Sequence, residues 1–264
     1  MALRLITWNV NSIRLRLDNL ARLVERWQPD VICMQEIKVQ DAHFPTDTLL
    51  AGDYPHRVFR GMKSYNGVAI LSRAPLQAVE APDWCSKGDC RHLAVTLPDG
   101  IELHNFYVPA GGDIPDPEAN PKFAHKLQFL DEMTHYFATE RDARRKLVMV
   151  GDLNIAPLEH DVWSHKQLLD VVSHTPVEVA RMGKLREGLG WVDAVRNFVP
   201  ETEKLYSWWS YRARDWDLSD RGRRLDHIWV TKPLQSRLKG ASILREARGW
   251  AQPSDHVPVI VDLA

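Results

Sequence analysis

Apolar residues occur along this chain in short runs separated by polar turns, and in two longer segments with helical spacing. The runs predict buried strands over residues 3–8, 31–35, 67–72, 93–97, 101–108, 147–150, 225–230 and 257–263. Apolar positions three and four residues apart predict a helix over 17–27, stopped by Pro29, and a longer helix over 123–137. The charged stretch 158–188 is predicted to be mostly helical.

The order of these elements indicates the fold class. Strands and hairpins are mixed with helices and do not alternate strictly, which argues against a doubly wound nucleotide-binding fold. We therefore expect an α/β fold, a four-layered sandwich of two packed mixed β-sheets flanked by helices. We find no linker, so residues 1–264 are expected to form a single domain, and the Pro- and Gly-rich stretch 109–121 is interpreted as an active-site loop.

Several predicted strands adjoin polar side chains of the kinds that bind metal ions or transfer protons. Three of the runs lead into such residues and a fourth follows a pair of them: Asn9 and Asn11, Glu36, Asp152 and Asn154, and Asp255 and His256. A single Asp beside a His is weak support for a site, because a solvated carboxylate next to a core histidine is the commoner arrangement. The four strand ends together predict one acidic cluster at the edge of a sheet.

The composition of this cluster suits a hard metal ion. Asn9 and Asn11 are two residues apart, as are Asp152 and Asn154, so within each pair both side chains should point to one face of an extended chain. Oxygen ligands of this kind suit Mg²⁺ or Mn²⁺. The alternative is that these residues only make turns after strands, which is their commonest role. The repeated spacing also predicts two similar halves related by a pseudo-two-fold axis.

Composition and charge narrow the class of protein. The chain has 264 residues, is 44% hydrophobic, and carries a net charge of −1, which is typical of a soluble globular protein and not of a uniformly basic one. No apolar run approaches the ~20 residues of a membrane span, and the N-terminus lacks the features of a signal peptide. The three cysteines are too few for a disulfide framework, so we expect a reduced, cytoplasmic protein.

Charge is uneven along the chain. Residues 204–248 hold eleven Lys and Arg against five Asp and Glu, interleaved with Trp and Tyr. Such a segment fits attraction of phosphates combined with stacking on bases or sugars. It fits about equally well a solvated face over a Trp-containing core. We expect Trp208 to recognise substrate shape away from the metal ligands, and Trp209 to be partly core.

Short motifs follow one another from the first predicted strand to the last: Thr7-Trp8-Asn9-Val10-Asn11, Pro29-Asp30-Val31-Ile32-Cys33-Met34-Gln35-Glu36, Asn105-Phe106-Tyr107-Val108-Pro109, Gly151-Asp152-Leu153-Asn154, Tyr206-Ser207-Trp208-Trp209, Arg224-Leu225-Asp226 and Ser254-Asp255-His256. Together they resemble the exonuclease III family of abasic-site endonucleases, of the bacterial type, within the wider endonuclease/exonuclease/phosphatase superfamily. The resemblance covers essentially the whole chain and implies a DNase I-like sandwich.

The resemblance also implies roles for the polar residues. Glu36 and Asp255 would ligate a divalent metal, and Asp152 would also transfer a proton. His256, held by Asp226, would contact the scissile phosphate. The metal set implied in this way is Asn9, Glu36, Asp152, Asn154 and Asp255, and the catalytic set is Tyr107, Asp152, Asn154, Asp226 and His256.

Four further residues are expected to contact DNA. Arg91 and Lys126 match family positions near the DNA backbone, although each is more often merely a solvated charge, and Trp208 and Arg223 belong to the expected pocket for a base-less sugar. Arg223 stands where animal-type members carry Trp, and Ala110 stands where many members carry an Asn or Gln that can donate to the phosphate. These departures leave the balance between 3′-exonuclease and abasic-site cleavage open.

The activity implied is that of a DNA-repair nuclease that depends on Mg²⁺, with Mn²⁺ as the alternative ion. It would incise 5′ to abasic sites and remove nucleotides or blocking groups from 3′ ends of duplex DNA, and we expect a monomer. A superfamily phosphatase acting on a phosphoinositide or sphingolipid is less favoured, because Trp208 and Trp209 with Arg221, Arg223 and Arg224 suit DNA better than a headgroup. A DNA-binding protein without catalysis would lack a ligand, and none is missing.

Overall fold

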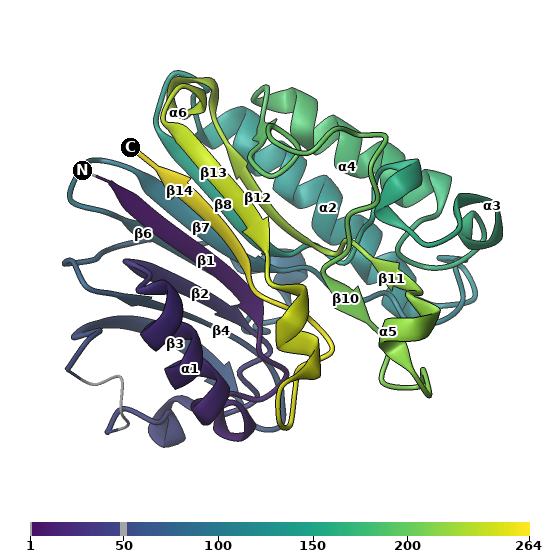
Figure 1. The fold of residues 1–264 in the computed structure, drawn as a ribbon. Coiled ribbons are helices and arrows are strands. Elements are labelled where there is room, and N and C mark those ends of the chain that lie inside the picture. The colour runs from purple at the N-terminus through teal and green to yellow at the C-terminus, as the bar shows by residue number, and fades with distance from the viewer. Residues whose placement is uncertain (1, 48–51) are drawn as a thin grey trace.

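The computed structural model describes residues 2–47 and 52–264, and within them two six-stranded sheets pack face to face (Figure 1). In spatial order the first sheet consists of β13 (Leu238–Ile243), β14 (Val259–Leu263), β1 (Leu3–Asn9), β2 (Val31–Gln35), β4 (Tyr65–Ser72) and β3 (His56–Met62). The second consists of β5 (Gln77–Val79), β6 (His92–Thr96), β7 (Glu102–Tyr107), β8 (Leu147–Asp152), β12 (Asp226–Val230) and β9 (Val192–Asp193).

The two sheets share one plan. β1 is parallel to β2 and antiparallel to β14, while β8 is parallel to β7 and antiparallel to β12. The central strands β1 and β8 are thus equivalent, and they end at Asn9 and Asp152. This arrangement agrees with the two similar halves expected from the repeated spacing.

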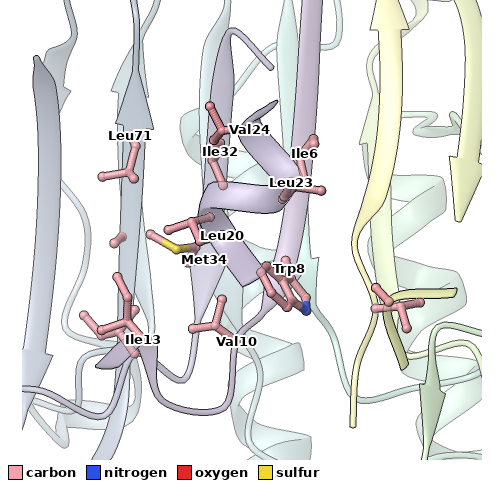
Figure 2. Packing of buried hydrophobic residues seen from close by; sticks show 14 of the residues in the cluster. Ile6, Trp8, Val10, Ile13, Leu20, Leu23, Val24, Ile32, Met34 and Leu71 are labelled. Atoms are coloured by element: carbon pink, nitrogen blue, oxygen red, sulfur yellow. The ribbon is translucent and has the colours of Figure 1, made fainter. Parts of the chain in front are cut away.

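Helices cover the outer face of each sheet. Helix α1 (Leu17–Trp27) packs Leu20 and Leu23 against the first sheet near Ile6 and Ile32, as Figure 2 shows. Helices α2 (Pro121–Glu140) and α4 (Pro176–Gly188) cover the second sheet. The four layers expected from the sequence are therefore confirmed.

The remaining elements are α3 (His165–Leu168), α5 (Trp216–Ser219), α6 (Lys232–Gln235), the paired strands β10 (Trp208–Trp209) and β11 (Gly222–Arg223), and 3-10 helices η1 (Ile13–Leu15), η2 (Asp41–His43), η3 (Trp84–Ser86), η4 (Glu159–Asp161) and η5 (Arg245–Gly249).

Strand alternation brings the polar ends of β1 and β8 together. Leu5 packs between the sheets, so Asn9, four residues later, also points between them. Val148 and Val150 pack in the same layer and place Asp152 there. The Asn9 Nδ2 donates to Asp152 Oδ2 at 2.9 Å, which joins the two sheets at this end of the sandwich.

The structure differs from the sequence prediction in several elements. Strands β3 and β13 were not predicted, because they are edge strands whose side chains are mostly half-buried and lack a continuous apolar run. In the stretch 158–188, predicted to be mostly helical, the one long helix is α4. β14 begins at Val259 and not at 257, since Pro258 cannot donate to a ladder. No helix in the described part of the chain is long and apolar enough to cross a membrane.

Candidate active site

A cavity of about 760 Å³ opens where β2 and β8 end. Acidic and imidazole side chains from both sheets line part of it: Glu36, Asp152, Asp255 and His256. Aromatic, aliphatic and basic side chains line another part of it, among them Trp163, Val171, Val172, Trp208, Arg221, Arg223 and Leu225. The structure thus gathers the predicted strand-end residues and the predicted substrate pocket around one opening.

His256 lies between two carboxylates. Its Nδ1 donates to Asp226 Oδ2 at 2.8 Å, and its Nε2 lies 3.6 Å from Asp152 Oδ2. Ser207 fixes Asp226 from the other side, because the Ser207 Oγ donates to the same Asp226 oxygen at 2.6 Å. The carboxylate therefore sets the orientation and tautomer of the imidazole.

Burial and charge shift the pKa values of this group. Burial alone would lower the pKa of His256, but the negative charges of Asp226 and Asp152 outweigh it and raise that pKa, so the ring is an imidazolium at neutral pH. Burial raises the pKa of Asp152 against the attraction of His256, and the nearby Asp226 raises it further. Asp152 is therefore suited to exchange a proton near neutral pH.

Glu36 remains ionised although it is partly buried. Burial raises the pKa of Glu36, but Lys38, with hydrogen bonds from Tyr107 and Asn9, lowers it further than burial raises it. Lys38 Nζ lies 2.7 Å from Glu36 Oε2, and the Tyr107 hydroxyl donates to Glu36 Oε1 at 2.7 Å. Burial and the charge of Glu36 hold the pKa of Tyr107 well above its usual value, so Tyr107 stays a hydroxyl donor.

Asp255 is held by two donors. The Trp208 indole Nε1 donates to Asp255 Oδ2 at 3.0 Å, and Asn11 Nδ2 donates to Asp255 Oδ1 at 3.0 Å. Asn11 also accepts from Lys38 Nζ at 2.5 Å. The expectation that Trp208 lies away from the metal ligands is wrong, since it bonds directly to one of the proposed ligands.

The two pairs with i, i+2 spacing form matching turns. The backbone N–H of Asn11 donates to Asn9 Oδ1 at 3.0 Å, and that of Asn154 donates to Asp152 Oδ1 at 2.9 Å. Asn11 and Asn154 have φ of 44° and 54°, so neither pair is extended and the expected common face is wrong. Asn9 Oδ1 accepts from Asn11, and the Asn9 NH₂ donates to the carboxylates of Glu36 and Asp152.

Lys126 does not present its charge to a ligand. It is fully buried and forms an ion pair with Glu178, and its Nζ donates to the Asn154 carbonyl at 2.8 Å. The expected contact of Lys126 with DNA is therefore wrong, because its charge is already paired inside the protein. Lys126 instead positions the turn that carries Asn154, and the Asn154 side chain donates to the Val108 carbonyl at 2.8 Å.

The other predicted basic contacts divide between the interior and the cavity. Arg91 is 5% exposed, pairs with Asp89 and lies 4.9 Å from the centre of the Tyr107 ring, so it supports the phenol and does not reach out to solvent. Arg224 is also buried, between Asp161 and Asp193. Neither arginine is placed to contact DNA as expected, because each guanidinium is buried and paired with carboxylates of the protein itself. Arg221 and Arg223 do line the cavity.

Sequence reasoning assigned no role to three residues that hold the site together. Lys38 bridges Glu36 and Asn11, Ser207 bonds to Asp226, and the Ser254 Oγ donates to the Asn9 carbonyl at 2.7 Å. Ser207 and Ser254 lie inside the motifs named above, and Lys38 follows Glu36 by two residues. Their closeness in sequence to the candidate site residues could have indicated a supporting role.

The positions of the carboxylates bear on where a metal ion would bind. Among the described residues, the candidate ligand atoms of Asp152, Asp226 and His256 lie within 4.8 Å of one another. These three already contact one another, because His256 Nδ1 is hydrogen-bonded to Asp226 and its Nε2 lies 3.6 Å from Asp152 Oδ2. Glu36, Asp113 and Asp255 are carboxylates outside this group that line the same cavity. Carboxylate oxygens are the ligands that Mg²⁺ takes from proteins.

Comparisons with known proteins agree with this fold. The chain belongs to the Endonuclease/Exonuclease/phosphatase family, which it matches over residues 6–256. Within it the chain is an exonuclease III-like nuclease: it is 30% identical to exodeoxyribonuclease III of Haemophilus influenzae over 97% of this chain and 98% of that protein. An AP endonuclease structure from Archaeoglobus fulgidus superposes with a TM-score of 0.91 at 34% identity, covering 98% of both chains. The 3′ phosphatase NExo from Neisseria, bound to a product DNA hairpin, superposes with a TM-score of 0.91 at 32% identity, covering 99% of both chains.

Proposed function

We propose that this protein is a Mg²⁺-dependent DNA-repair nuclease that incises 5′ to abasic sites and removes nucleotides or blocking groups from 3′ ends of duplex DNA. Residues 1–264 would act as one domain and as a monomer in the cytoplasm. The observation that carries the proposal is the position of His256, held between Asp226 and Asp152 in a cavity that Glu36 and Asp255 also line.

The donor set fits a hard divalent ion. Glu36 and Asp255 offer carboxylate oxygens, and Lys38 already places one positive charge between Glu36 and Asn11. This contact supports an ionised Glu36 that can bind a cation. Mg²⁺ binds in proteins through one or two carboxylates and keeps several waters, which this set allows, with Mn²⁺ as the alternative. When bound, the ion would neutralise phosphate charge and stabilise the leaving oxygen.

The other residues supply the remaining chemistry of hydrolysis. The His256 imidazolium would bind a non-bridging phosphate oxygen, and the Tyr107 hydroxyl would donate to the same developing charge. Asp152, with its raised pKa, would accept the proton of the attacking water. Asn154 would be placed beside Asp152 by its turn. Each group faces the cavity or bonds to one that does.

The likeness to nucleases that act on DNA supports DNA as the substrate over a lipid headgroup. The Archaeoglobus protein is an AP endonuclease, and the Neisseria protein is bound to a DNA hairpin. In this chain Trp208 and Arg223 line the cavity next to the proposed catalytic groups. An aromatic face beside a cation suits a nucleic-acid sugar or base.

One experiment tests this function. A labelled duplex with a single abasic-site analogue and a duplex with a recessed 3′ end would each be incubated with the protein, with and without a chelator. We expect cleavage 5′ to the abasic site and shortening from the 3′ end, both abolished by the chelator and restored by Mg²⁺. Cleavage of neither duplex, or hydrolysis of phosphoinositides instead, would refute the proposal.

A further inference from the structure

Three short backbone segments lie side by side in the part of the cavity that Trp208 and Arg223 line. Trp208 pairs with His256 on one side and with Arg223 on the other. Neighbouring strands are about 5 Å apart, so the backbones of His256 and Arg223 are about 10 Å apart. A side chain at position 223 can therefore meet a small group attached to a phosphate that His256 holds.

Arg223 is a cation in unusual surroundings. Its guanidinium lies 5.3 Å from the centre of the Trp208 ring, and its Nη1 donates to the Val172 carbonyl and Ser173 Oγ at 3.0 and 2.8 Å. Its Nε is buried without a partner, and among the described residues no carboxylate lies at ion-pair distance from it. Burial lowers the pKa of Arg223, while the charge of Glu178 raises it, and Glu178 is already paired with Lys126.

A guanidinium with an unpartnered N–H and no counter-ion favours an anionic ligand over a neutral one. Part of the surrounding wall is apolar, with Val171 and Leu225 beside Trp163, and these side chains offer the guanidinium no counter-charge. Arg221 adds a second cation near the opening, since it is exposed and lies 4.7 Å from the centre of the Trp163 ring.

We propose that Arg223 makes this pocket select a 3′ blocking group that carries its own oxyanion beyond the scissile phosphodiester, in preference to a neutral sugar. The inference rests on the proposed nuclease function. In the reaction, water attacks phosphorus and the bond from phosphorus to the DNA 3′ oxygen breaks. The 3′ oxygen takes a proton, and the blocking group leaves as its phosphate monoester, so no further reactant is needed.

The test compares duplexes that differ only in the charge of this group. One pair ends in a carboxymethyl or a carbamoylmethyl phosphodiester at the 3′ end, and the other ends in a terminal abasic residue with or without its own 3′-phosphate. The first pair probes a carboxylate and the second a phosphate. For the wild-type protein with Mg²⁺, we expect the charged member of at least one pair to have a kcat/KM about ten-fold higher.

The variants assign this preference to Arg223. Arg223→Leu should bring the ratio to about one or below, and Arg223→Lys should retain part of it. Arg144→Leu, at a side chain 90% exposed and outside the cavity lining, should leave the ratio and the overall rate unchanged. Melting temperatures show whether each variant is folded.

Two results would overturn the inference. The first is a wild-type ratio of one or below in both pairs, which needs no variant to interpret. The second is an unchanged ratio in a folded Arg223→Leu protein, which would make Arg223 a structural residue. If the wild-type protein cleaves neither these duplexes nor the abasic duplex, the proposed nuclease function itself has failed and the inference fails with it.

Discussion

Trp208 donates its indole N–H to the Asp255 carboxylate at 3.0 Å while its ring lies next to the Arg223 guanidinium in the cavity. Trp208 therefore contacts both Asp255, a proposed metal ligand, and Arg223, which we propose to select the substrate. Groups that hydrogen-bond to metal ligands orient them, and their loss typically costs about 10- to 100-fold in metal affinity. Metal binding and substrate recognition are thus expected to be linked through Trp208.

Trp208→Phe separates these two roles because Phe keeps an aromatic ring and lacks the N–H. We expect the variant to bind Mn²⁺ about ten-fold more weakly, since Asp255 would keep only its bond from Asn11. Trp208→Ala should in addition lose base or sugar stacking worth about 1–3 kcal/mol. Titration with Mn²⁺ and KM for an abasic duplex measure the two effects, and unchanged Mn²⁺ affinity in the Phe variant would refute the link.

Trp209 serves as the matched control for Trp208. It is 2% exposed, and its Nε1 donates to Asp220 at 3.0 Å. Trp209→Ala should lower the free energy of unfolding by about 3–5 kcal/mol, because it leaves a large cavity in the core. The folded fraction should bind Mn²⁺ normally, which the same titration with thermal unfolding would show.

Glu36→Gln should nearly abolish activity and weaken binding of the divalent ion. A neutral amide is a poor substitute for a carboxylate ligand, and Lys38 would lose its ion-pair partner. Circular dichroism should show an intact fold. Glu140→Gln, at an exposed residue that ends α2, is the control for loss of one negative charge. Cleavage near the wild-type rate at sub-millimolar Mg²⁺ would contradict the assignment of Glu36 as a ligand.

The layers and most strands of this fold were predictable because a buried strand requires a run of apolar residues in the sequence. Residues 31–34 and 147–150 are apolar at every position, since each sheet buries one face against the other sheet and the other face against helices. The strands β3 and β13 lie at the edges of the first sheet and have no continuous apolar run. Their place follows from pairing with β4 and β14, which is a property of the whole fold.

The residues of the site were predictable in identity and less so in role. The strand ends were expected to form one cluster, and the structure does bring Asn9 into contact with Asp152. The direction in which the Asn9 amide points depends on a turn with positive φ at Asn11, which the i, i+2 spacing did not reveal. The same holds for Lys126: its charge predicted a surface position, and only the fold shows that α4 brings Glu178 to meet it.

Asp226→Asn should reduce activity through His256. The amide removes the charge that raises the pKa of His256, so the imidazolium would lose its proton at lower pH than in the wild-type protein. If His256 acts as the imidazolium, activity of the variant should fall as pH rises past the ordinary range near 6.5, while wild-type activity persists to higher pH. Rates of cleavage measured across pH for both proteins test this, and coinciding profiles would contradict it.

Lys126→Met should destabilise the protein by about 3–5 kcal/mol, because Glu178 would be left buried without its partner. Lys126 does not reach solvent, so the slope of log DNA affinity against log salt concentration should not change. Lys122→Met, at an exposed residue one turn earlier on α2, controls for loss of charge from this helix. Adding Glu178→Gln to Lys126→Met should recover part of the lost stability. A salt slope reduced by about one in the folded Lys126→Met protein would instead place Lys126 on the DNA backbone.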